Sequence, residues 1–377
     1  CLVSFYTIQM SVTGTVLGIF FALVLSPFGA ANLGFPAVIR RILRIVIQIL
    51  RSFPALILAL TATFLFGLGT FAGTFAITLY TFAIMTKLTY EDASAADVKA
   101  YQALRAMGVS KYVAYIHGIL PEIIPGFLTN ALYLLETNVR HSSILGYVGA
   151  GGIGLLLNEK ISWLEYDKVG TILLMLFLTV CVIEYFSRYL AALIRKERTI
   201  KKEQARLLLL FLAALFLICT FTLSLPDFSR TSPQTLRNMF AGFLQPDWSF
   251  FFSAEKDGLG YLLLETVCIA FIGTVIGAIV SAPLAFLNTK RFVPAPVSFL
   301  FNLVIMVIRS VPFLVYGLIF IRVSGPGAFT GVLTLAVCSI GLLTKRFTEA
   351  LDALDPRPYH ALLAMGVRPL PAICHSV

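Results

Sequence analysis

Residues 91–121 read EDASAADVKAYQALRAMGVSKYVAYIHGILP, a charged stretch inside a chain that is otherwise mostly apolar. Ala, Leu, Lys and Gln favour a helix over residues 93–107, and Gly108 can adopt the left-handed conformation that ends one. Ser110 is placed to cap a second short helix, and Pro121 suits the first turn of the helix after it. The stretch therefore predicts an elbow of short helices joining two longer ones.

A second copy of this stretch occupies residues 345–377, which read KRFTEALDALDPRPYHALLAMGVRPLPAICHSV. Lys345 lies 258 positions after Lys87, and the same shift superposes Tyr359 on Tyr101 and the Ala-Met-Gly-Val of 364–367 on that of 106–109. Earlier in the chain, GTVLG at 14–18 recurs as GTVIG at 273–277. Spaced copies of this kind predict two equivalent halves.

The composition indicates a membrane protein. The 377 residues are 58% hydrophobic and 13% charged, with a mean hydropathy of +0.89, which is too apolar for a soluble chain of this length. The net charge of +10 does not require a nucleic-acid partner, because most of the 29 Lys and Arg residues fall on one side of the predicted topology, as in the positive-inside pattern. The six Cys and four His residues are scattered, so neither a metal site nor a cofactor is predicted.

The apolar stretches predict an all-α polytopic fold. Small residues at Gly14 and Gly18 favour close packing of the first span against a neighbour. The second span either crosses with tilt or bends at Pro54. We expect a short break at 27–36 and a polar, Gly-rich connection at 137–167. The predicted spans are 3–25, 37–65, 66–86, 120–136, 168–194, 207–225, 261–287, 295–323 and 328–344.

Two repeated segments carry charge into the membrane. Arg-Ser-Phe-Pro at 51–54 recurs as Arg-Ser-Val-Pro at 309–312. A buried arginine costs at least about 2.5 kcal/mol in a bilayer, so it needs an acidic partner, a wet cavity or an anion. One interpretation pairs each arginine with a buried acid such as Glu136, Glu184 or Glu265. The other places both arginines on a path for an anionic substrate, with the candidate residues Arg51, Ser52, Pro54, Arg309, Ser310 and Pro312.

Residues 136–154 read ETNVRHSSILGYVGAGGIG. Their glycines match the G-x-G-x-x-G of dinucleotide sites, but no βαβ unit surrounds them, so that interpretation fails. The chain also has no G-x-x-x-x-G-K-[ST] sequence, so we expect no ATPase within it. We expect the glycines to form tight turns near a substrate gate and to pack against the other half, and the candidate path residues are Glu136, Asn138, Arg140, Gly149, Gly151, Gly152 and Gly154.

The stretch at 91–121 contains a glutamate and small residues, then A-x-x-A-x-G, and then L-P. This pattern resembles the cytoplasmic EAA loop of permease subunits in binding-protein-dependent ABC importers. Arg-Ser-x-Pro is similar to segments of methionine importer permeases, whereas the run at 136–154 resembles the phosphonate branch. The resemblance implies a type I transmembrane domain of two homologous halves in the bacterial cytoplasmic (inner) membrane. It implies that the loop docks on a separate ATPase subunit through Glu91, Ala103, Ala106, Gly108, Leu120, Pro121, Glu349, Ala361, Ala364 and Gly366.

The predicted function is ATP-driven import of a phosphonate or a related phosphorus oxyanion, delivered by an extracytoplasmic binding protein. The chain itself is not expected to be an enzyme. We expect membrane lipid to contact its apolar helices. Alternatives are a permease for methionine or another small organic solute, and an ion-gradient transporter. We expect a first half at 1–194 without its opening helix, a cytoplasmic basic linker at 195–206, and a second half at 207–377 truncated in its coupling loop, within a longer protein.

Overall fold

The computed structural model describes residues 2–194, 202–224, 247–252, 258–289, 293–354 and 357–367, together with a few isolated positions between 234 and 245. Every regular element in these ranges is helical, which confirms the all-α prediction. The chain forms two compact units, Cys1–Gln245 and Pro246–Val377, and each is described by itself.

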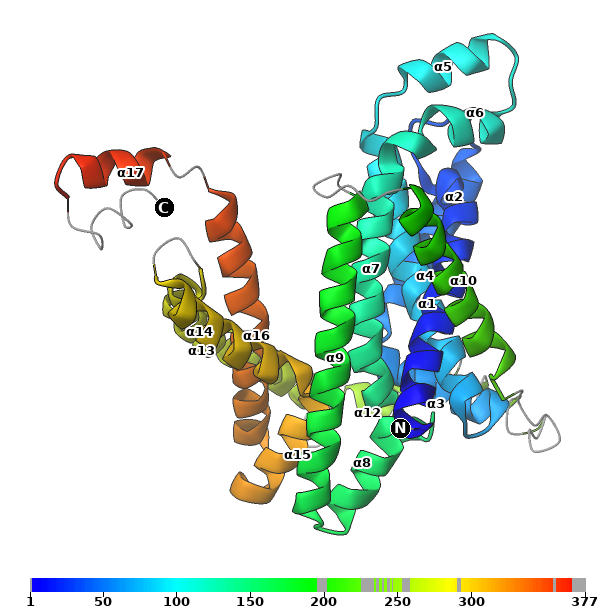
Figure 1. The fold of residues 1–377 in the computed structure, drawn as a ribbon. Helices are drawn as coiled ribbons and strands as arrows, with labels where there is room; N and C mark the ends of the chain where they lie inside the picture. The colour runs from blue at the N-terminus through cyan, green and yellow to red at the C-terminus, as the bar shows by residue number, and fades with distance from the viewer. Residues whose placement is uncertain are drawn as a thin grey trace. The chain divides into compact units, whose positions relative to one another are not determined.

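The first unit is a bundle of long helices with the elbow at one end and α8 at the other (Figure 1). Its elements are α1 (Leu2–Gly29), α2 (Ala37–Ser52), α3 (Ala55–Phe66), α4 (Thr70–Ala95), α5 (Lys99–Ala106), α6 (Lys111–Gly118), α7 (Leu120–Leu145), the 3₁₀ turn η1 (Gly146–Val148), α8 (Ile153–Ser162), α9 (Tyr166–Ile194) and α10 (Lys202–Phe221).

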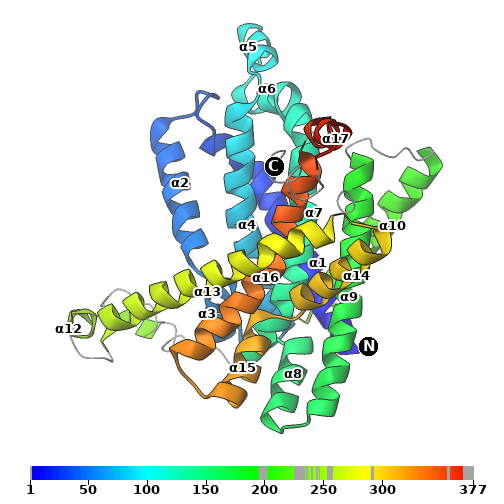
Figure 2. The same cartoon turned by 90° about the vertical axis from the view of Figure 1, so that its left-hand side faces the viewer.

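The second unit repeats part of this arrangement. It contains α12 (Trp248–Phe251), α13 (Leu259–Asn288), α14 (Ala295–Ser310), α15 (Phe313–Ser324), α16 (Ala328–Ala353) and α17 (Arg357–Ala364). Figure 2 shows α14 turning into α15 and α17 lying across the end of α16. The aromatic rings of Trp248, Phe251 and Phe252, which precede α13, are exposed and contact one another.

Small residues set the closest helix packing in both units. A Cβ added at Gly14 would lie 2.8 Å from Ile77 Cβ, and one at Gly18 would lie 2.7 Å from Thr81 Cβ, so α1 and α4 touch backbone to backbone. In the second unit a Cβ at Gly277 would lie 2.4 Å from Ser339 Cβ on α16. The prediction that the repeated GTV-x-G segments bring helices close is confirmed.

Five described helices are long and apolar enough to cross a membrane, or eight if each bent pair is one span. The second predicted span bends by 95° between α2 and α3 at Pro54, and its counterpart bends by 84° between α14 and α15. Proline at each bend cannot donate the helical hydrogen bond, which explains the break. Bending at Pro54, one of the two alternatives from the sequence, is therefore what occurs.

Several predicted boundaries were wrong. Helix α1 continues through Pro27 to Gly29, and α7 runs to Leu145, so the predicted polar connection begins as helix. The predicted helix over 93–107 is interrupted at 96–98, because α4 continues to Ala95 before α5 begins.

The sequence repeat divides the chain at residues 195–206, whereas the packing divides it after Gln245. Residues 195–201 of the predicted linker lie outside the described residues, and α10 begins at Lys202. Gln9 on α1 donates hydrogen bonds from Nε2 to the Cys219 carbonyl (3.1 Å) and to Thr222 Oγ1 (2.9 Å). These contacts place α10 in the first compact unit, although the repeat predicts that it opens the second half.

Candidate functional site

The elbow begins at a tight turn after α4. Asp97 Oδ1 accepts a hydrogen bond from the Lys99 backbone N–H at 3.0 Å and so secures the first turn of α5. This bond, followed by that from the Lys99 side chain, lowers the pKa of Asp97 below its ordinary value. The Asp97 backbone N–H donates to Glu122 Oε1 (3.4 Å) at the start of α7. The two arms of the elbow are therefore tied together at its base.

Both copies of the elbow end their first helix in the same way. Gly108 has a φ of +86°, and the Val109 N–H donates to the Leu104 carbonyl at 3.2 Å. Gly366 has a φ of +83°, and the Val367 N–H donates to the Leu362 carbonyl at 3.1 Å. This left-handed helix end is the one predicted from the glycines. Ser110 occupies the position before α6 as predicted, but its hydroxyl makes no capping bond.

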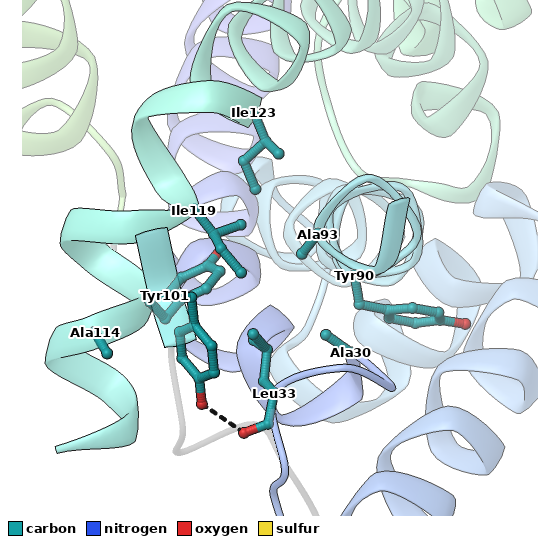
Figure 3. Close-up of a cluster of buried hydrophobic side chains, with 9 residues drawn as sticks. Ala30, Leu33, Tyr90, Ala93, Tyr101, Ala114, Ile119 and Ile123 are labelled. Carbon is teal, nitrogen blue, oxygen red and sulfur yellow. Dashed lines mark hydrogen bonds between the residues drawn. The ribbon is translucent and has the colours of Figure 1, made fainter. Parts of the chain in front are cut away.

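A buried cluster joins the elbow to the turn between α1 and α2 (Figure 3). Tyr101 of α5 is 5% exposed, and its hydroxyl donates to the Leu33 carbonyl at 2.6 Å. Burial raises the pKa of Tyr101. Around it pack Ala30, Leu33, Tyr90, Ala93, Ala114, Tyr115, Ile119 and Ile123. Sequence analysis aligned Tyr101 with Tyr359 but gave it no role, since its partner lies 68 residues away.

Further bonds fasten the same turn to α4 and α2. Asn32 Nδ2 donates to the Ala93 carbonyl at 2.9 Å. Arg44 donates from Nε (3.0 Å) and Nη2 (2.8 Å) to the Gly29 carbonyl, where α1 ends, and its guanidinium lies 5.1 Å from the Tyr90 ring centroid. The elbow, the α1–α2 turn and the start of α2 therefore form one tied assembly.

The predicted coupling residues on α5 and α17, and in the glycine turn that ends each of these helices, are exposed, whereas Leu120 is half-buried against the elbow cluster. Ala103, Ala106 and Gly108 are exposed in the first, and Met107 between them is 71% exposed. Ala361, Ala364 and Gly366 are exposed in the second, and Met365 is 78% exposed. Glu91 forms an ion pair with Lys87 (3.5 Å) and Glu349 with Lys345 (3.9 Å). Leu120 and Pro121 form the first turn of α7. Small exposed side chains around one methionine allow close approach by a partner.

The path residues on the first bend lie at the end of α2. Arg51 and Ser52 are both exposed, and the Ser52 hydroxyl donates to the Ile49 carbonyl at 2.7 Å. Pro54 immediately precedes α3. At the second bend, the Ser310 hydroxyl donates to the Val307 carbonyl at 2.8 Å and Pro312 precedes α15. A Cβ added at Gly341 of α16 would lie 2.9 Å from Arg309 Cγ, so the half-buried Arg309 stem packs closely on that helix.

Two of the three acidic partners suggested from sequence, Glu136 and Glu184, pair with other arginines. Glu136 forms an ion pair with Arg140 one turn further along α7, and Glu184 pairs with Arg188 at 3.1 Å on α9. Among the described residues Arg51 makes no ion pair. Arg51 therefore differs from Arg140, whose charge is compensated within its own helix.

Asn138 is the centre of a buried polar network that joins three helices. Its Nδ2 donates to Thr15 Oγ1 on α1 and to Thr81 Oγ1 on α4, each at 2.8 Å. Ser142, one turn along α7, is hydrogen bonded to Ser11 on α1. All of these side chains are 2% exposed or less. The network fixes the register of the bundle, which explains the buried hydroxyls in otherwise apolar helices.

The glycine-rich segment turns back against its own unit. Gly149, Gly151 and Gly152 have positive φ values of 84°, 80° and 75°, as the prediction of tight turns requires. The Gly149 carbonyl accepts from Gly69 N–H (3.0 Å). Gly154 packs on α7, where an added Cβ would lie 1.9 Å from the Ser143 carbonyl oxygen. The segment thus packs on α7 and on the turn before α4, and packing against the other half stays a prediction.

A cavity of about 460 Å³ lies beside this segment. Its lining includes Tyr6, Thr70, Gly152, Glu159 and Thr222. Thr70 is hydrogen bonded to Ser224 at 3.0 Å. Hydroxyl groups and one carboxylate line the cavity, which is therefore less suited to an anion than an arginine-bearing surface.

Comparison with known families identifies the class. Residues 14–224 match the model of the binding-protein-dependent transport system inner membrane component, which is more than half of the chain. The chain belongs to this family of ABC permeases, and it is an inner membrane component of a transport system. Permeases of this family are the membrane part of the transporter and are not themselves catalytic.

Three relatives illustrate the similarity. The chain is 26% identical over 368 residues to the phosphate-import permease protein PhnE of Mycolicibacterium smegmatis, covering 96% of this chain and 68% of the relative. It is 32% identical to the phosphite transport system permease protein PtxC of Stutzerimonas stutzeri, covering 48% and 66%. It is 30% identical to the putative cryptic phosphonate transport system permease protein PhnE2 of Escherichia coli, covering 30% and 94%.

A solved structure of the MetNI methionine ABC transporter aligns with a TM-score of 0.45 and 23% identity, covering 50% of this chain and 93% of that chain. For the first two relatives, this chain spans about two thirds of their length.

Proposed function

We propose that this chain is the membrane-spanning permease of an ATP-driven importer for a phosphorus oxyanion, most simply a phosphonate, with phosphite and phosphate as related substrates. The observation that carries the proposal is that relatives with 26–32% identity are named as phosphate, phosphite and phosphonate permeases. The polar residues of the first unit are compatible with an anionic substrate, since Arg51 has no ion-pair partner among the described residues.

The partners in this proposal are a separate ATPase and an extracytoplasmic binding protein. The exposed faces of α5 and α17, each with two alanines and a methionine, are the surfaces that would dock on ATPase subunits. The bonds from Tyr101 and Asn32 support this role, because they would transmit movement of α5 to α1, α2 and α4. Arg51, Arg309 and Arg140 are the side chains that would attract the anion along the path.

The repeat supports a division into homologous halves at 1–194 and 207–377 with a basic linker at 195–206. The packing of α10 on the first unit is compatible with that division, because a helix can belong to one half by sequence and pack on the other. The location of the Arg-rich and Lys-rich segments supports a cytoplasmic position for both elbows.

The test is reconstitution of the full chain with its ATPase and binding protein in proteoliposomes, followed by uptake of methylphosphonate, phosphite, phosphate and methionine. Uptake of a phosphorus oxyanion that requires ATP and the binding protein supports the proposal. Uptake of methionine alone would contradict it, as would uptake that persists without the ATPase and follows an ion gradient.

One variant tests the path in the second unit. We expect Arg309→Ala to abolish uptake while the complex still assembles, because the arginine is the charged group at the α14–α15 bend. Assembly is measured by co-purification of the ATPase, and wild-type uptake by the variant would remove Arg309 from the path.

A further inference from the structure

The end of α2 presents a charge that its own helix does not compensate. Arg51 is exposed and makes no ion pair among the described residues, and the chain bends by 95° directly after it. An arginine on a membrane helix is costly unless it faces water, an acid or an anion. This exposed face of α2 is therefore a candidate to contact a solute.

Tyr80 on α4 brings a hydroxyl group to the same place. Tyr80 and Ala55, the first residue of α3, pack against one buried cluster that includes Leu58 and Ala59. Tyr80 interacts electrostatically with Arg51 of α2 and with Tyr133 of α7, and Arg51 interacts in the same way with Tyr90, ten residues further along α4. Three helices thus contribute a guanidinium and two phenol groups to one region of the first unit.

His141 adds a fourth polar group from α7. It lies eight residues after Tyr133, so the two side chains share a helix face. Its ring centroid is 5.0 Å from that of Tyr80, in an edge-to-face arrangement. Among the residues that the structure describes, the buried His141 Nδ1 has no hydrogen-bond partner. An unpaired buried polar atom is unfavourable, and a bound hydrogen-bonding ligand would satisfy it.

We propose that Arg51, Tyr80, Tyr133 and His141 form a binding site for a tetrahedral phosphorus oxyanion within the first unit. The guanidinium can hold two oxygens of such an anion at once, and the phenol and imidazole groups can donate to the others. The positive end of the α3 helix begins just beyond Arg51 and adds to the attraction. The site rests on the proposed function and names where this chain would hold its substrate.

The second unit differs from this set at one aligned position. Arg309 aligns with Arg51 at the shift of 258, but Cys338 stands where Tyr80 does in the first unit. A thiol is a weak hydrogen-bond donor compared with a phenol. The two aligned arginines therefore do not have the same phenol beside them.

The experiment measures how much phosphorus oxyanion is moved per ATP hydrolysed by the reconstituted full complex, with methylphosphonate and inorganic phosphate as probes. The variants are Tyr80→Phe, Arg51→Gln and His141→Asn. The matched controls are Tyr185→Phe, an exposed tyrosine on α9, and Arg41→Gln, an exposed arginine on α2. The binding protein is added in saturating amounts and fully loaded with the oxyanion, so that differences between variants reflect the permease and not delivery of the substrate.

For Tyr80→Phe and Arg51→Gln we expect at least about a tenfold fall in oxyanion moved per ATP, since each removes a hydrogen bond to a charged group. ATP hydrolysis stays at the wild-type rate, and both controls behave as wild type. A wild-type ratio in Tyr80→Phe overturns the site. Parallel loss of ATP hydrolysis and transport also overturns it, because that result indicates a structural role. Failure of the wild-type complex to move any phosphorus oxyanion instead refutes the proposed function.

Discussion

Replacing Gly18 by alanine should destabilise the first unit. The added Cβ would lie 2.7 Å from Thr81 Cβ and 2.8 Å from the Thr78 carbonyl oxygen. Ordinary carbon–carbon contacts are about 3.5–4.0 Å, so α1 and α4 would have to separate by about 1 Å. Overpacking of this kind costs about 1–3 kcal/mol. The separation would also stretch the bonds from Asn138 to Thr15 and Thr81, which join α7 to both helices.

The assay is thermal unfolding of the purified chain in detergent, where about 2–4 °C is lost per kcal/mol in a unit of this size. The matched control is Gly170→Ala on α9, because a Cβ there meets nothing within 4 Å. Since alanine favours helix over glycine by about 0.8–1.0 kcal/mol, the control should be no less stable than wild type. Gly277→Ala should destabilise the second unit in the same way, with its Cβ 2.4 Å from Ser339 Cβ. Equal stability of Gly18→Ala and Gly170→Ala would refute the close packing.

Three further predictions concern the elbow and α10. Tyr101→Phe removes the hydrogen bond to the Leu33 carbonyl, so we expect less uptake per ATP hydrolysed. The control is Tyr112→Phe, whose hydroxyl makes only a 3.5 Å contact. Equal uptake per ATP in both variants would show that the Tyr101–Leu33 bond does not couple the elbow to the α1–α2 turn. Because the pKa of Asp97 is lowered, its support of α5 is present above the ordinary carboxyl pKa of 3.8 and lost as the pH falls through the lower folded value. A spin label at Gln102 should therefore become more mobile on acidification, and in Asp97→Ala, which removes the side-chain acceptor, it should be mobile throughout. Mobility that does not change with pH in the wild type would contradict the support of α5 by Asp97. Gln9→Leu loses both side-chain hydrogen bonds, to the Cys219 carbonyl and to Thr222. In a variant without the other five cysteines, the buried Cys219 should therefore react faster with maleimide. An unchanged labelling rate would show that these bonds do not hold α10 in place.

The parts of the fold that sequence analysis predicted correctly are local or repeated. Gly108 and Gly366 end helices because only a residue without a Cβ adopts those backbone angles at little cost. The bend at Pro54, one of two alternatives that the sequence left open, follows from the missing N–H of proline. The glycines of 14–18 and 273–277 were recognisable because the same spacing occurs twice. In each case a few neighbouring residues determine the structure.

The parts that sequence analysis missed depend on partners distant in the chain. Asn138 was selected as a candidate within the run at 136–154, but its partner Thr15 lies 123 residues away. Tyr80 and His141 carried no motif, and the contact between their rings follows only from the packing of α4 and α7. Helix α7 was predicted to end at 136 because residues 137–167 are polar and rich in glycine, whereas buried hydrogen bonds from Asn138 and Ser142 to α1 and α4 stabilise the helix there.

Comparison of the two copies separates features of movement from features of substrate binding. The Lys87–Glu91 pair, the left-handed glycine and the exposed methionine recur in the second copy, as expected if both elbows bind similar partners. Around the α2–α3 bend, however, Tyr80 becomes Cys338, whereas Arg51 is matched by Arg309. A phenol donates a hydrogen bond more strongly than a thiol. If the proposed site holds the anion, Tyr80 is therefore the aligned group that distinguishes the first unit from the second.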